Sequence, residues 1–196
     1  MFSFFHTHER QIFMGNILFV VCCGFYLAWW LTAFSPSGVT QSTKTNWLLL
    51  PAIFTGILGI VLIIRGILTK VQVNQSLPGI YIILGGIAAY FILLAATVSL
   101  FKRPATSELI LIVGWGALML SEVNALFGSG LLSHKLTVGF VITICAAVAV
   151  SLVCYVLYFR LNSLAGYIDG MIPLLLAALT MSVISCYMAI LGNNGH

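Results

Sequence analysis

Charged side chains are scarce in this chain. Lys and Arg together number 8 and Asp and Glu 4 in 196 residues, so that charged residues make up 6%, against about 25% in an ordinary soluble domain. The charges leave long charge-free stretches at 11–43, 45–64, 71–101, 136–159 and 170–196. Because a helix needs about 20 mostly apolar residues to cross a bilayer, these stretches exclude a soluble globular protein. The few cations are isolated and form no basic patch, so we expect no nucleic-acid partner.

Familiar catalytic and cofactor motifs are also missing. The chain has no HExxH, no GxSxG, no Gly-rich phosphate loop and no CxxC pair, and its five cysteines lie in apolar runs, where they read as small buried hydrophobes. His6, His8 and Glu9 resemble part of a metal site, but zinc normally takes four ligands, or three and a water. We therefore expect no metal or cofactor, a solvated segment before the first apolar run, and a protein that is more plausibly not an enzyme.

Hydrophobic residues make up 61% of the chain and the mean hydropathy is +1.14. Backbone groups inside lipid must pair within their own segment, so each apolar run is predicted to be a helix. The sequence thus predicts an all-α integral membrane protein, a six-transmembrane-helix bundle in a single domain over 1–196. The predicted spans are 11–34, 47–68, 78–101, 107–127, 137–159 and 170–192.

Loop charges do not decide the orientation of this bundle. The positive-inside rule counts Lys and Arg in short loops, and four fall on each side: Arg10, Arg65, Lys70 and Lys135 against Lys44, Lys102, Arg103 and Arg160. We expect both termini to be cytoplasmic, as in many six-span proteins, in a cell membrane of bacterial type.

The equal number of Lys and Arg residues on the two sides is compatible with an inverted repeat of three plus three helices, as in many transporters. In each half an arginine near a helix end, Arg65 or Arg160, precedes a proline, Pro78 or Pro173, by thirteen residues. Arginine at a helix end and proline in a first turn are each common on their own, so both readings stay open.

Glu122 is the main candidate for a functional residue, because it is the acid that lies well inside a predicted span. A charge at the bilayer centre costs about 2.5–3.5 kcal/mol on insertion scales, so such acids are read as proton, ion or substrate sites, and an uncompensated one favours its neutral form. Trp115 lies on the same helix face, and Asn124 adds a polar group off that line. The alternatives are a structural ion pair or hydrogen bond, and exposure at the interface.

The remaining charged candidates lie at predicted helix ends. Arg65 and Arg160 suit the C-terminal ends of spans two and five, where they would complement the helix dipole and reach the headgroups. Either could instead bind an anionic substrate or pair with Asp169. Asp169 precedes the sixth span and is expected to be its N-cap.

The tryptophans gather on one side of the predicted bundle. Trp29 and Trp30 lie near the end of span one, Trp47 opens span two and Trp115 lies early in span four. An aromatic belt at the membrane interface explains such residues, but a belt should occupy both faces. The alternative is an aromatic vestibule for a ligand, lined by Tyr26 and by at most one of Trp29 and Trp30, which lie about 100° apart on a helix.

The leading functional hypothesis is a small transporter or channel for a small solute or ion, with proton coupling through Glu122 as one option. A second is an integral-membrane enzyme, or a protein that binds a lipid or apolar ligand in the aromatic vestibule. A third is an accessory subunit that packs through small-residue ladders such as Ala117, Ser121 and Ala125. The expected partners are the bilayer and a small-molecule or ion substrate, and a homo-oligomer stays open.

Overall fold

The fold is known from a computed structural model that describes residues 7–33, 43–74, 78–101, 106–158, 160–161 and 163–194. Within these residues every regular element is a helix, and six helices are long and apolar enough to cross a membrane, as predicted. The element order is α1 (Thr7–Ala33), the 3₁₀-helix η1 (Thr43–Leu48), α2 (Leu49–Asn74), α3 (Pro78–Phe101), α4 (Thr106–Gly128), α5 (His134–Tyr158), α6 (Ser163–Asp169) and α7 (Ile172–Asn194).

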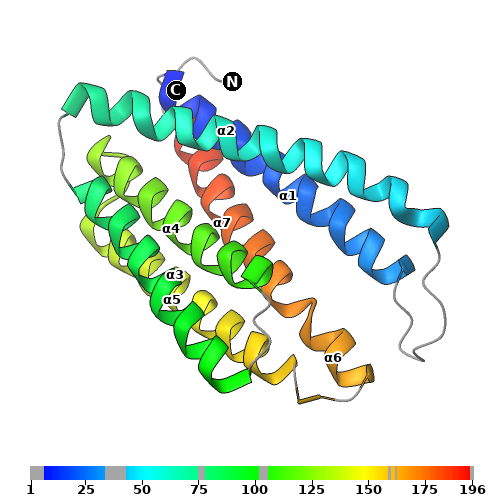
Figure 1. The fold of residues 1–196 in the computed structure, drawn as a ribbon. Coiled ribbons are helices and arrows are strands. Elements are labelled where there is room, and N and C mark those ends of the chain that lie inside the picture. Colours follow the sequence, from blue (N-terminus) through cyan, green and yellow to red (C-terminus); the bar gives the residue numbers. More distant parts are fainter. Residues whose placement is uncertain are drawn as a thin grey trace.

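The outer surface of the bundle is apolar. Leu50, Ile92 and Leu111 leave 70%, 69% and 69% of their surface exposed, whereas large exposed apolar patches are rare on soluble monomers. Such side chains are suited to contact with lipid tails. The start of α1 and the end of α7 lie at the same end of the bundle (Figure 1), as an even number of spans requires.

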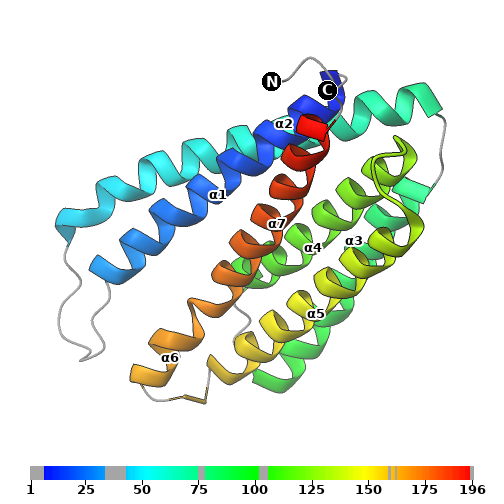
Figure 2. The same ribbon diagram turned by 180° about the vertical axis from the view of Figure 1, so that it is seen from behind.

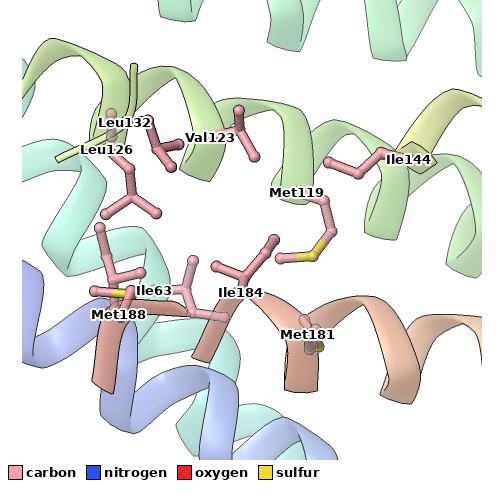
Figure 3. Close-up of a cluster of buried hydrophobic side chains, with 11 residues drawn as sticks. Ile63, Met119, Val123, Leu126, Leu132, Ile144, Met181, Ile184 and Met188 are labelled. Atoms are coloured by element: carbon pink, nitrogen blue, oxygen red, sulfur yellow. The ribbon is translucent and has the colours of Figure 1, made fainter. Parts of the chain in front are cut away.

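The helices form two groups with α7 between them (Figures 1 and 2). α1 and α2 run antiparallel along their lengths, and α3, α4 and α5 pack in sequence order on the other side. α7 packs against both α1 and α5 and so joins the two groups. Figure 3 shows the central contact, where buried side chains of α4 and α7 face each other. The labelled side chains are Ile63, Met119, Val123, Leu126, Leu132, Ile144, Met181, Ile184 and Met188.

Glycines bring α1 and α2 into backbone contact. A Cβ atom on Gly15 of α1 would lie 2.8 Å from the carbonyl oxygen of Gly59. A Cβ atom on Gly66 of α2 would lie 2.7 Å from the carbonyl oxygen of His8. Small residues allow such close approach between membrane helices. We call Gly15, Gly59 and Gly66 the glycine seam. It makes α1 and α2 a closely joined hairpin.

The turn between α4 and α5 is built by local capping. Gly130 adopts a φ of 77°, and the N–H groups of Gly130 and Leu131 donate to the carbonyls of Phe127 and Leu126 at 2.9 and 3.2 Å. This is a Schellman motif, which favours glycine at the left-handed position. Ser133 then caps α5 by accepting a hydrogen bond from the N–H of Leu136 at 3.4 Å.

The predicted spans differ from the helices most at the end of the second, because α2 continues to Asn74 and not to residue 68. α3 has the bounds that the sequence predicted, and α1, α4 and α5 differ from prediction by a few residues at their ends. α7 matches the predicted sixth span to within two residues at each end, but a further short helix, α6, precedes it and ends at Asp169. Pro173 has no N–H to donate to a preceding turn, so it begins a new helix and cannot continue α6.

Candidate functional site

A carboxyl–amide pair lies at the centre of the bundle. Asn16 Nδ2 of α1 donates a hydrogen bond to Glu122 Oε1 of α4 at 2.6 Å, and both side chains are 0% exposed. We call Asn16 and Glu122 the central pair. At 1.5 Å per residue, Asn16 is about 14 Å along α1 from its first residue. Of the alternatives given for Glu122, exposure at the interface does not fit this burial, whereas the hydrogen bond of the structural alternative is present.

The central pair keeps unused hydrogen-bonding capacity. Among the described residues, neither Glu122 Oε2 nor Asn16 Oδ1 has a hydrogen-bond partner, although both atoms are buried. No Lys or Arg in the described part of the chain lies within 4.0 Å of the Glu122 carboxylate oxygens to form a salt bridge. A buried charge without a countercharge is costly, so binding of a cation or proton at these oxygens is favourable.

The other predicted members of this site do not join it. Asn124 is half-buried and lies about 200° round the helix from Glu122. Trp115 was predicted on the same side as the other tryptophans, but it lies closer to the middle of α4 than to either end. Its side chain packs against the central cluster, and its indole nitrogen is buried with no hydrogen-bond partner in the described residues.

A second acid, Glu9, is buried on the same helix as Asn16. It is 3% exposed, and Glu9 Oε1 lies 3.6 Å from His8 Nε2. The prediction of a solvated segment here is wrong, because α1 already begins at Thr7 and turns Glu9 inward. Glu9 and Asn16 lie two turns apart on one face of α1, about 10 Å along its axis. His6 lies outside the described residues. Within the described ones, no three His, Cys, Asp or Glu residues are grouped so that they could hold a metal ion.

The aromatic residues of α1 diverge, as the spacing of Trp29 and Trp30 on the helix predicted. Tyr26 and Trp29 have ring centroids 5.3 Å apart, and Trp29 Nε1 donates to Asn46 Oδ1 of η1 at 3.3 Å. Trp30 turns to the other side, where its Nε1 donates to the Tyr167 carbonyl of α6 at 3.2 Å and its ring stacks on that tyrosine. This divergence follows from the 100° between neighbours on a helix.

Trp30 also covers the break between α6 and α7. A Cβ atom on Gly170 would lie 2.7 Å from Trp30 Cζ2, so a larger residue would collide with the indole. The N–H of Gly170 donates to the Gly166 carbonyl at 3.0 Å, which closes the last turn of α6. Trp30 thereby ties α1 to the divided sixth span.

Asp169 lies in another position than predicted, whereas the two arginines lie near the ends of the second and fifth candidate spans, as expected. Asp169 ends α6 and does not begin the sixth spanning helix, so the expected N-cap is wrong. Its side chain is 6% exposed. Arg65 lies inside α2, well before its end at Asn74, while Arg160 follows the end of α5 in a turn. Both arginine side chains are exposed, and neither forms a salt bridge with Asp169.

An apolar groove opens between α2, α3 and α4. Its volume is about 510 Å³, and its walls include Ile64 of α2, Ile87 of α3 and Val113 of α4. Ser121, the neighbour of Glu122 in sequence, lines it as well. The groove therefore lies between α2 and α3, and its α4 wall includes the residue next to Glu122 in sequence.

No protein-family model, curated protein or solved structure matches this chain.

The sequence reasoning missed Asn16, Ser185 and the glycine seam. Asn16 lies in a charge-free stretch and carries no formal charge, so a search for charges passes over it. Its position could have been noticed as an amide inside a predicted span, flanked by apolar residues. Polar side chains in membrane helices hydrogen-bond across helices, so such an amide indicates a contact with another helix. The seam could have been found from Gly59 and Gly66, which lie seven residues, or about two turns, apart on one face of α2.

Proposed function

We propose that the protein is a small membrane transporter or channel for a small solute or ion, and that Glu122 is the group that binds the ion or proton. The observation that supports it is the central pair, in which Asn16 holds one oxygen of a fully buried carboxyl group and leaves the other available. An acid in the bilayer is costly to keep. If Glu122 served only to pair with Asn16, an uncharged side chain could do so at a lower cost.

The entrance that we propose lies at the end of the bundle where α1 begins. Glu9 and His8 are close together there, and Glu9 shares the buried face of α1 that carries Asn16. Carboxylates and histidines along one face are typical of proton pathways in membrane proteins. Under this proposal the exposed Arg65 and Arg160 anchor helices at the headgroups or attract anions.

The break between α6 and α7 lies at Gly170 and Met171, at the outer end of α7 (Figure 1). Transporter sites are typically formed by helices that are discontinuous near the middle of the membrane, so this break does not carry the proposal. We further propose an inverted repeat that relates α1–α3 to α4–α7, on the basis of the matching arginine and proline positions. α3 is continuous where the sixth span is divided, so the two halves of such a repeat would differ at this point.

Proton flux into proteoliposomes tests the proposal. The protein is reconstituted with a pH-sensitive dye inside the vesicles, a pH gradient is imposed, and potassium with valinomycin compensates the charge. We expect the wild-type protein to dissipate the gradient and Glu122→Gln to lose this flux while it still inserts and purifies. The matched control is Glu108→Gln, the same change near the start of α4, which should retain the flux. Unchanged flux in Glu122→Gln would remove Glu122 from the site.

A second candidate function is the binding of a lipid or another apolar ligand in the groove between α2, α3 and α4. Its volume of about 510 Å³ falls within the roughly 300–1,000 Å³ of ordinary ligand pockets. Ala117 and Gly86 line it, and a Cβ atom on Gly86 would lie 2.9 Å from that of Ala117. Mass spectrometry of the purified protein should then find a retained lipid-like molecule that Ala117→Phe displaces. Equal lipid content in both proteins would reject this candidate.

A further inference from the structure

Ser185 of α7 departs from the pattern of the other buried hydroxyl groups. Ser151 donates to the Ala147 carbonyl at 2.8 Å and Thr180 to the Leu176 carbonyl at 2.7 Å, each within its own helix. Ser185 is 4% exposed, yet its Oγ has no hydrogen-bond partner among the residues that the structure describes. A buried hydroxyl left unpaired costs about 1–3 kcal/mol. Its position therefore calls for a polar partner in the interior.

Ser185 belongs to the face of α7 that is turned toward the central pair. Its helical neighbours Met181, Ile184 and Met188 lie in the central cluster, where they face α4 (Figure 3). Glu122 lies on the buried face of α4, and Asn16 is one turn from Ile12, which also belongs to this cluster. Residues of α1, α4 and α7 thus contribute to one buried cluster, and Asn16, Glu122 and Ser185 are buried polar side chains on these three helices.

Four buried oxygens on these helices have no hydrogen-bond partner among the described residues: Gln11 Oε1, Asn16 Oδ1, Glu122 Oε2 and Ser185 Oγ. Gln11 lies about 8 Å along α1 from Asn16 and about 140° round the helix, and we call the other three the open oxygens. The amide oxygen only accepts, the hydroxyl both donates and accepts, and the carboxyl oxygen accepts when ionised and donates when protonated. A buried water typically makes about three hydrogen bonds. The open oxygens therefore match one water molecule or one hydronium ion in number and type.

A hard metal cation fits the open oxygens less well. Ca²⁺ takes roughly six to eight oxygen ligands, and Mg²⁺ requires octahedral geometry. The backbone carbonyls within these helices are already engaged in helical hydrogen bonds, so three side-chain oxygens leave most of such a shell unfilled.

We propose that Asn16, Glu122 and Ser185 form a three-helix site whose cargo is a proton delivered by water. This inference rests on the proposed function and names its ion. In the binding step one O–H bond of a hydronium ion breaks and one forms at Glu122 Oε2, which leaves a neutral carboxylic acid and a water molecule. The water is held by Ser185 Oγ and Asn16 Oδ1. No electron transfer is involved.

Titratable groups on the surrounding helices lie off this site or at its edge. Glu9 and His8 lie toward the end of α1, Arg65 is exposed on α2, and Cys186 is exposed on α7. Tyr187 of α7 donates to the Leu131 carbonyl at 3.4 Å. Proton uptake therefore neutralises a charge that no lysine or arginine balances within the described residues.

Infrared spectroscopy of the reconstituted protein tests this site separately from transport. The Glu122 band is identified as the carboxyl band that Glu122→Gln removes. Ser185→Ala should shift this band, because the water-mediated hydrogen bond to the carboxyl group is lost, and should lower proton flux by about tenfold or more. The control is Ser151→Ala, which removes a hydroxyl that is 2% exposed and bonded within its own helix. It should change neither the band nor the flux by more than about twofold.

The outcomes separate the two proposals. A Glu122 band that is equal in wild-type protein and Ser185→Ala overturns the three-helix site, whatever the flux. If the band shifts in Ser185→Ala but the wild-type protein moves no protons, the three-helix site stands and the proposed function is overturned. A band that responds to added Na⁺ at constant pH as it does to acid overturns the assignment of the proton as cargo.

Discussion

The glycine seam gives a stability prediction whose size follows from distances. In Gly15→Ala the new Cβ atom would lie 2.6 Å from Ile63 Cγ1 and 2.8 Å from the Gly59 carbonyl oxygen. Ordinary Cβ contacts begin at 3.4 Å, so α1 and α2 must separate by about 0.6 Å along this direction. The side chain of Ile63 can rotate, but the carbonyl of Gly59 belongs to a helix and cannot. Overpacking of this kind costs about 1–3 kcal/mol of unfolding free energy.

Gly24→Ala supplies the control on the same helix. A Cβ atom at Gly24 would meet nothing within 4 Å in the described residues, and alanine is the better helix former. Thermal unfolding in detergent, followed by circular dichroism, should show Gly15→Ala melting several degrees below the wild-type protein, at about 2–4 °C per kcal/mol for a chain of this size. Gly24→Ala should melt at or slightly above the wild-type temperature. Equal melting temperatures for the two variants would refute the close contact between α1 and α2.

Three further changes test other contacts. Trp30→Phe should lower the melting temperature by the equivalent of about 1 kcal/mol, because it removes the indole donor to α6. Trp29→Phe should have less effect, because the hydrogen bond of Trp29 is exposed. Equal effects of the two changes would favour an interfacial belt. Gly170→Ala should destabilise the protein by about 1–3 kcal/mol in the same assay, since the indole of Trp30 occupies the space for a Cβ atom; a neutral result would contradict that packing. Asn16→Leu should abolish proton flux and lower the unfolding free energy by about 1–3 kcal/mol, because the buried Glu122 carboxyl loses its donor. The control Asn124→Leu should retain the flux. Loss of flux in both variants would remove the distinction between the two amides.

The number and type of the spans could be predicted because the bilayer allows few alternatives. Apolar runs of sufficient length must become helices in lipid, and the six helices follow from that rule. The division of the sixth span could not be predicted in the same way. Residues 163–169 form a short segment that includes an acid, so the sequence there is typical of a loop, and α6 depends on tertiary contacts with α5, α7 and Trp30.

The burial of Glu122 was foreseeable, but its partner was not. Charge is rare enough in this chain that one acid inside a span is conspicuous. Asn16 is a single amide about one hundred residues away in sequence, and its approach to Glu122 depends on how α1 packs between α2, α4 and α7. The divergence of Trp29 and Trp30 was foreseeable from their 100° spacing on a helix. Their partners were not, because Trp29 contacts η1 and Trp30 contacts α6 through tertiary packing.

The central claim is that Asn16 and Glu122 act together as one buried ion-binding pair. The most direct test exchanges the two residues, because the double variant Asn16→Glu/Glu122→Asn keeps one carboxyl and one amide across the same helix contact. Proton flux is measured in proteoliposomes for the double variant and for each single change. We predict that Asn16→Glu alone and Glu122→Asn alone lose the flux, and that the double variant recovers it to within about tenfold of the wild-type rate. A double variant no more active than the single ones would contradict the account.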